Sequence, residues 1–88
     1  MILAHRPDVR ARELPNGEAA LMTPDDEVLI LLNPLGVVVW ELCDGERAVD
    51  EITATLAAQF ANTDAVQIGE DVARLVADLQ RLGVLESR

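Results

Sequence analysis

The residue types that most often carry covalent or metal chemistry are scarce in this chain. It has a single histidine, His5, and a single cysteine, Cys43, which lie far apart in the sequence. A zinc site needs three or four protein ligands, and a nucleophilic dyad needs a base beside its nucleophile. We expect His5 to lie in a frayed terminus and Cys43 to pack as a small hydrophobe at the end of a helix. The sequence therefore predicts no enzyme activity, no metal and no cofactor.

Carboxylates form one cluster that resembles a divalent-cation site. The cluster contains Asp44, Glu46, Asp50 and Glu51. Its spacing lacks the alternating ligands of a calcium loop. Asp50 and Glu51 are better interpreted as acids in the first turn of a helix, where the helix dipole favours negative charge.

The overall charge restricts the kinds of partner. Sixteen acidic residues stand against seven arginines and no lysine, which gives a formal charge of -9. Such a field repels phosphate backbones and attracts basic partners, although strong acidity is also a common solubility device. We predict no nucleic-acid partner.

The first third of the chain has strand and turn signals. Residues 9–14 alternate weakly between apolar and charged side chains, and residues 18–23 form a second candidate strand. Asn16-Gly17 between them is the strongest short hairpin signal, because both residues tolerate positive φ. Thr23-Pro24 then opens a turn that leads into a third strand, Val28 to Leu32. The sequence predicts a three-stranded antiparallel meander.

The third strand is apolar throughout, from Val28 to Leu32. A strand without alternation is expected to have both faces covered. The last strand of a meander is also an edge, and a long apolar edge is a template for pairing with another chain.

The rest of the chain predicts three helices. Asn33 has the side chain of an N-cap and Pro34 suits the first helical position, so the first helix spans 34–43. The second runs from about Val49 to Phe60, and the third from Thr63 or Asp64 to Leu82, with an Asp64–Gln67 capping box and Gly83 after its end. The apolar stripes that we expect to face the core are Leu35, Val38, Val39 and Leu42, with Trp40 on the flank; Val49, Ile52, Leu56 and Phe60; and Ile68, Val72, Leu75, Val76, Leu79 and Leu82. Val84-Leu85 docks as a short terminal extension.

These elements predict one α+β domain over residues 1–88, winged-helix-like, with a three-stranded antiparallel sheet followed by three helices. The apolar N-terminal stretch is too short for a signal peptide, and its charges follow it instead of preceding it. No segment has the apolar length of a membrane span. We expect a cytoplasmic protein with no membrane partner.

A conjunction of short motifs resembles the PqqD family, whose members are also called RiPP recognition elements. The shared features, in order over residues 6–86, are Leu32-Asn33, the Gly36 to Trp40 spacing, Leu42-Cys43-Asp44-Gly45, Glu51-Ile52, Asp71-Val72, and the ending formed by Leu79, Leu82, Gly83 and Leu85. The resemblance implies a non-catalytic adaptor that binds the leader of a ribosomally made precursor peptide. It also implies an enzyme partner, such as the radical S-adenosylmethionine (SAM) enzyme of pyrroloquinoline quinone biosynthesis or the enzyme of a related pathway.

In that family the leader adds as a strand to the third strand of the meander, in a groove walled by the third helix. Strand addition takes affinity from main-chain groups and selectivity from side-chain pockets. Carried onto this sequence, the resemblance implies a peptide-binding edge of Glu27, Val28, Leu29, Ile30, Leu31 and Leu32, and a wall of Asp71, Arg74, Leu75, Asp78 and Leu79. Leu75 and Leu79 have ordinary core packing as their alternative role. Glu70–Arg74 and Arg74–Asp78 have the spacing of helical ion pairs, so the charged face is either self-paired or a rim that selects leader side chains.

Two other functions fit the same order of elements. A winged helix-turn-helix DNA-binding regulator would place the third helix in the major groove, but residues 64–82 carry four acids and two arginines. A self-associating structural module would pair its apolar edge with a second copy, giving a homodimer through the edge strand.

Overall fold

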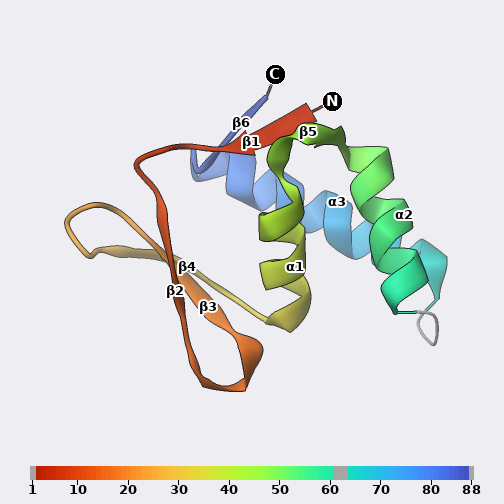
Figure 1. Ribbon diagram of the computed structural model, residues 1–88, viewed down its shortest axis with the longest axis horizontal. Helices are drawn as coiled ribbons and strands as arrows, with labels where there is room; N and C mark the ends of the chain where they lie inside the picture. The colour runs from red at the N-terminus through yellow and green to blue at the C-terminus, as the bar shows by residue number, and fades with distance from the viewer. Residues whose placement is uncertain (1, 61–63, 88) are drawn as a thin grey trace.

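The computed structural model describes residues 2–60 and 64–87. In these residues the chain forms two three-stranded antiparallel sheets and three α-helices (Figure 1). The predicted α+β class is confirmed. In chain order the elements are β1 (Ile2–His5), β2 (Arg10–Glu13), a 3₁₀ turn (Pro15–Gly17), β3 (Ala19–Met22), β4 (Val28–Leu32), α1 (Pro34–Leu42), β5 (Asp44–Ala48), α2 (Val49–Gln59), α3 (Ala65–Arg81) and β6 (Leu85–Ser87).

The predicted meander forms the first sheet, in the order β2-β3-β4. Asn16 and Gly17 both have positive φ, 69° and 77°, in the connection between β2 and β3. At the next turn, the Asp26 amide donates to the Thr23 carbonyl at 3.0 Å, and Asp26 itself has a φ of 65°. The turn residues therefore act as the sequence predicts. Strands β2 and β3 are shorter than expected, and β4 has the predicted bounds.

The expectation that both faces of β4 are covered is wrong for the chain alone. Leu32 is buried, but Val28 is 53% exposed and Leu31 is 66% exposed. The strand pairs with β3, whose residues are all buried. No element of the described chain covers the outward side chains, so β4 presents apolar surface at the edge of the sheet.

A second sheet, in the order β5-β1-β6, was not predicted. The segment after α1, where no strand was predicted, forms β5 and pairs with β1, and the terminal extension pairs with β1 as β6. His5 is therefore not in a frayed terminus. Its ring stacks on that of Trp40 with centroids 3.8 Å apart, and its Nε2 forms a hydrogen bond with the Trp40 carbonyl. Under this ring Trp40 is only 5% exposed, so it lies in the core and not on the flank of the helix.

The helix ends follow the predicted caps, with one exception. Asn33 accepts the Gly36 amide at 2.8 Å at the start of α1, as predicted. Asp64 caps α3 by accepting the Val66 amide at 2.8 Å. The expected Asp64–Gln67 capping box does not form, because the side-chain amide of Gln67 donates instead to the carboxylate of Asp71 at 2.9 Å.

The core lies between the three helices and continues into both sheets. Its buried members come from every helix and from both sheets; they are Leu3, Leu21, Leu32, Val39, Trp40, Cys43, Ile52, Leu56, Ile68, Val72, Val76, Leu79, Val84 and Leu85. Phe60 and Leu82, expected on buried stripes, are partly exposed at the ends of their helices. Among the described residues no helix has the length and apolarity that a membrane span requires.

Candidate functional site

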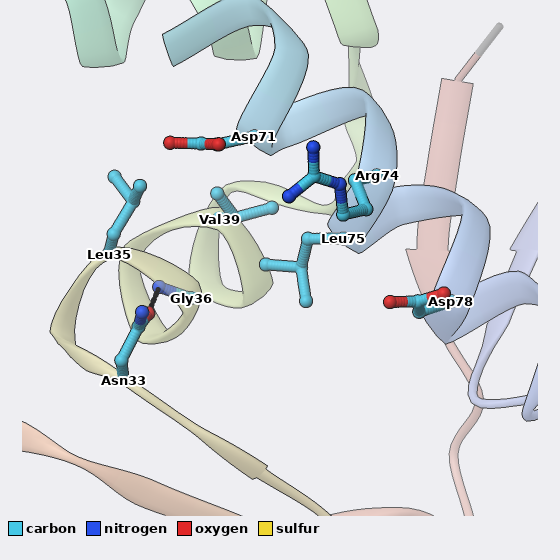
Figure 2. A pocket seen from close by; sticks show the side chains of 8 residues that line it. All are labelled: Asn33, Leu35, Gly36, Val39, Asp71, Arg74, Leu75 and Asp78. Atoms are coloured by element: carbon cyan, nitrogen blue, oxygen red, sulfur yellow. Dashed lines mark hydrogen bonds between the residues drawn. The ribbon is translucent and has the colours of Figure 1, made fainter. Parts of the chain in front are cut away.

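A groove runs from the end of β4 to the space between α1 and α3. One pocket, of about 280 Å³, is lined by Asn33, Leu35, Gly36, Val39, Asp71, Arg74, Leu75 and Asp78 (Figure 2). A second, of about 260 Å³, is lined by Glu18, Leu31, Leu32, Asn33, Gly36 and Leu75. The two pockets share three lining residues, so we treat them as one groove. It is open along β4 and walled by α3.

Gly36 lets the floor of the groove lie close to β4. A Cβ at this position would lie 3.3 Å from side-chain atoms of Leu32 and 3.2 Å from Oδ1 of Asn33. Both distances are tighter than ordinary contacts, and that Oδ1 already accepts the Gly36 amide. The absence of a side chain at Gly36 thus keeps the first turn of α1 against the end of β4.

The hydrogen-bonding pattern of the meander shows which main-chain groups of β4 point away from β3. The Leu14 amide donates to the Glu18 carbonyl, and the Thr23 amide donates to the Glu27 carbonyl, both at 2.9 Å. Main-chain groups alternate in direction along a strand, so the even-numbered residues of β3 face β2 and the odd-numbered residues face β4. Leu31 pairs with Ala20, an even-numbered residue. The N–H and C=O of Leu31 therefore point away from β3, toward the open edge.

The two edges of the meander differ in chemistry. On β2 the side chains of Arg10, Arg12 and Glu13 are all exposed. Charged residues on an edge strand discourage pairing with another chain. The edge at β4 has no such protection, because its exposed side chains, Val28 and Leu31, are apolar. Of these two edges, the β4 edge is the one suited to accept another strand.

The wall of the groove carries charge over an apolar floor. Asp71, Arg74, Leu75 and Asp78 all come from one side of α3 and line the first pocket. The two ion pairs that the helical spacing suggested for Arg74 are not formed. Asp78 instead pairs with Arg81, with 3.1 Å between Oδ1 and Nη2.

The comparisons with known proteins decide the family. The family model of coenzyme PQQ synthesis protein D (PqqD) matches residues 18–85. The chain belongs to the PqqD family. Among solved structures it is similar to TbiB1 in complex with the TbiA(beta) leader peptide, with a TM-score of 0.76, 17% sequence identity, and coverage of 97% of this chain and 96% of that chain. At this identity the similarity establishes the fold. None of the curated proteins compared with the chain matches it.

The structure of this PqqD-family chain brings together most of the residues that the resemblance assigned to the site. Leu31, Leu32, Asp71, Arg74, Leu75 and Asp78 line the groove. Glu27 precedes β4, where its amide donates to Oγ1 of Thr23 at 3.1 Å. Val28 and Ile30 lie on β4 outside the groove lining, and Leu29 lines a separate pocket of about 180 Å³ next to Pro24 and Leu82. Leu79 has none of its surface exposed, so its role is core packing and we leave it out of the site.

Sequence reasoning missed the contribution of α1 to the groove. Asn33, Leu35 and Gly36 line it, although Asn33 was interpreted only as a cap and Leu35 only as part of a core-facing stripe. Val39 lies beneath them with no exposed surface, as its predicted core role requires. Glu18 was also missed. The one signal that could have identified this wall is a glycine in the first turn of a helix, directly after the edge strand.

The remaining reactive residues of this PqqD-family chain have structural roles. Cys43 has no exposed surface, and burial, with a smaller effect of neighbouring Asp44, raises the pKa of its thiol from 9.0 to about 11. The Glu46 amide donates to Asp44 at 3.0 Å and, with Arg47, lowers the pKa of that carboxyl. Asp50 and Glu51 lie in the first turn of α2, as interpreted from the sequence. Among the described residues no group of His, Cys, Asp and Glu could hold a metal ion.

Proposed function

We propose that this domain binds an extended segment of the leader of a ribosomally made precursor peptide by adding it as a strand to β4. The observation that carries the proposal is the exposed apolar edge of β4, with main-chain groups of Leu31 directed outward, beside a groove walled by α3. Membership of the PqqD family supports the proposal, as does the likeness to TbiB1, which is seen with a leader peptide.

Strand addition uses the groove as well as the edge. Main-chain bonds to β4 supply affinity that does not depend on sequence, and alternate peptide side chains that point toward α3 enter the groove. The groove has the partly exposed apolar side chains of Leu35 and Leu75 beside three charged residues of α3. It therefore suits an apolar peptide side chain next to polar ones.

The test is a selection followed by a structural readout. Randomised peptides of about 12 residues, enough to span β4 and the groove at ~3.3 Å per residue, are displayed and selected on the immobilised domain. The tightest peptide is then added to ¹⁵N-labelled domain and amide exchange is measured. We expect the Leu31 amide to become protected, while the amides of β2 change little. Failure to enrich any peptide, or protection elsewhere without protection at Leu31, refutes strand addition at β4.

We further propose that the domain is not itself an enzyme and presents the captured leader to a modifying enzyme, such as a radical SAM protein of pyrroloquinoline quinone biosynthesis or a related pathway. Binding of this kind takes place in the cytoplasm, where precursor peptides are made. The pathway is tested by synthesising the short reading frames encoded near this gene and measuring which of them binds. The enzyme partner is the neighbouring gene product that is retained by the domain only when that peptide is present.

The same edge supports a second mode of association, a homodimer through β4 in the absence of peptide. An unoccupied apolar edge is a template for a second copy. If β4 serves both modes, saturating peptide converts the dimer to a monomer on size-exclusion chromatography. No observation favours DNA binding, since residues 64–82 of the chain have twice as many acids as arginines.

A further inference from the structure

Arg74 stands apart from the other charged residues of the groove. It is exposed, and within the described part of the chain it forms no ion pair or hydrogen bond. Figure 2 shows its guanidinium reaching from α3 toward the α1 side of the groove, beside Leu75. The neighbouring acids have other partners. The Asp71 carboxylate accepts a hydrogen bond from the side-chain amide of Gln67, and Asp78 forms an ion pair with Arg81. The cation is thus left directed into the groove.

The charged residues around Arg74 determine where along the groove an acidic peptide side chain can bind. It is the only cation among the described residues that line the groove, whereas Glu18, Asp71 and Asp78 are acids. A guanidinium binds a carboxylate through two parallel N–H···O bonds. An acidic peptide side chain therefore gains an interaction at Arg74 and meets repulsion at the other charged positions. The formal charge of -9 adds a long-range field that disfavours peptides with many acids.

We infer that Arg74 is a specificity-determining residue that requires one acidic side chain at a fixed position of the bound peptide, the position that faces α3 beside Leu75. The inference rests on the proposed function and names the chemistry of its ligand. The preferred segment has an apolar side chain for the groove and a single Asp or Glu at its charged rim, within an otherwise neutral or basic sequence.

The experiment repeats the selection of randomised peptides of about 12 residues on the native domain and on Arg74→Glu. We expect Asp and Glu to be enriched at a single position with the native domain, and Lys and Arg at the same position with the variant. Arg74→Gln abolishes the preference without reversing it. For a chosen peptide, exchanging its acid for a neutral residue weakens binding to the native domain by about 1.5-fold to fivefold and leaves Arg74→Gln binding unchanged.

Arg12→Glu is the matched control, because it makes the same charge change at an exposed position on β2, at the opposite edge of the sheet. It is expected to leave the enriched residues unchanged. Peptides that bind and protect Leu31 but show no acidic position, or an acidic position that Arg74→Glu does not reverse, overturn the inference and leave the proposed function standing. If no peptide is enriched by the native domain, both fail. Thermal melting of each variant checks that the fold is retained.

Discussion

Replacing Leu31 with proline tests the direction of the main-chain groups on β4. Proline has no N–H and is tolerated on edge strands where that N–H faces solvent. The N–H of Leu31 points to the open edge, and its side chain is 66% exposed. Proline also restricts the preceding residue to extended conformations, which Ile30 already has within β4. We therefore expect Leu31→Pro to fold and to lose one donor for the added strand.

The size of the loss follows from the energetics of an unpaired group. A net hydrogen bond contributes about 0.5–1.5 kcal/mol, and a buried carbonyl left without a donor costs about 1–3 kcal/mol. The bound peptide loses a donor and has one carbonyl left unpaired at the interface. We expect a penalty of about 2–3 kcal/mol, which corresponds to an increase in Kd of roughly 30-fold to 150-fold.

The assay is fluorescence anisotropy with the selected peptide, and two variants serve as controls. Leu31→Ala removes the same side chain but keeps the N–H, so the ratio of the two Kd values isolates the donor. Ile30→Pro removes an N–H that points into the sheet, because Ile30 pairs with Leu21. That variant should lower the free energy of unfolding by about 1–3 kcal/mol in urea denaturation. The reasoning is refuted if Leu31→Pro and Leu31→Ala bind equally well, or if Leu31→Pro destabilises the fold as much as Ile30→Pro.

Two further predictions concern the floor of the groove and the buried thiol. Gly36→Ala places a Cβ 3.3 Å from Leu32, and we expect the free energy of unfolding to fall by about 1 kcal/mol despite the better helix propensity of alanine. Gly69→Ala places its Cβ 3.8 Å from Thr53, an ordinary contact, and should raise the free energy of unfolding by about 0.5–1 kcal/mol. Urea denaturation that shows the same sign of change for both variants contradicts this explanation. The folded-state pKa of the Cys43 thiol is raised from 9.0 to about 11, so between these pH values the unfolded chain binds fewer protons than the folded one. The thiol therefore does not lower the free energy of unfolding below about pH 9, and that free energy falls as the pH rises toward 11. Urea midpoints measured across that range should show the decline in the native domain and lose it in Cys43→Ala; a decline that persists in the variant has another cause.

The elements predicted correctly are those fixed by neighbours in the sequence. Asn33 and Pro34 determine the start of α1, and the Gly36 amide completes the cap within a single turn. The hairpin at Asn16 and the turn after Thr23 depend on residues that adopt positive φ or a fixed φ at low cost. Such signals act over three or four residues and can be recognised without knowing what packs around them.

The elements missed are those that exist only through distant pairing. β5 contains Asp44, Glu46 and Arg47, a composition that favours a turn, yet it is a strand because β1 lies beside it. β6 is three residues long and pairs with the opposite end of the chain. The α1 side of the groove was missed for a related reason. Leu35 has the spacing of a core residue, and only the position of α3 makes it line a groove.

The unpredicted sheet connects the two helices that line the groove. Strand β1 pairs with β5, which begins two residues after α1 ends, and with β6, which follows α3. The C-terminal ends of both helices that line the groove are therefore tied to one strand. The stacked rings of His5 and Trp40 add a side-chain contact between β1 and α1. At the opposite end of α1, the Asn33 cap and Gly36 hold the helix against β4. Both ends of α1 are thus held by groups that leave the main-chain edge of β4 free, so a strand added there would not compete for the contacts that form the groove.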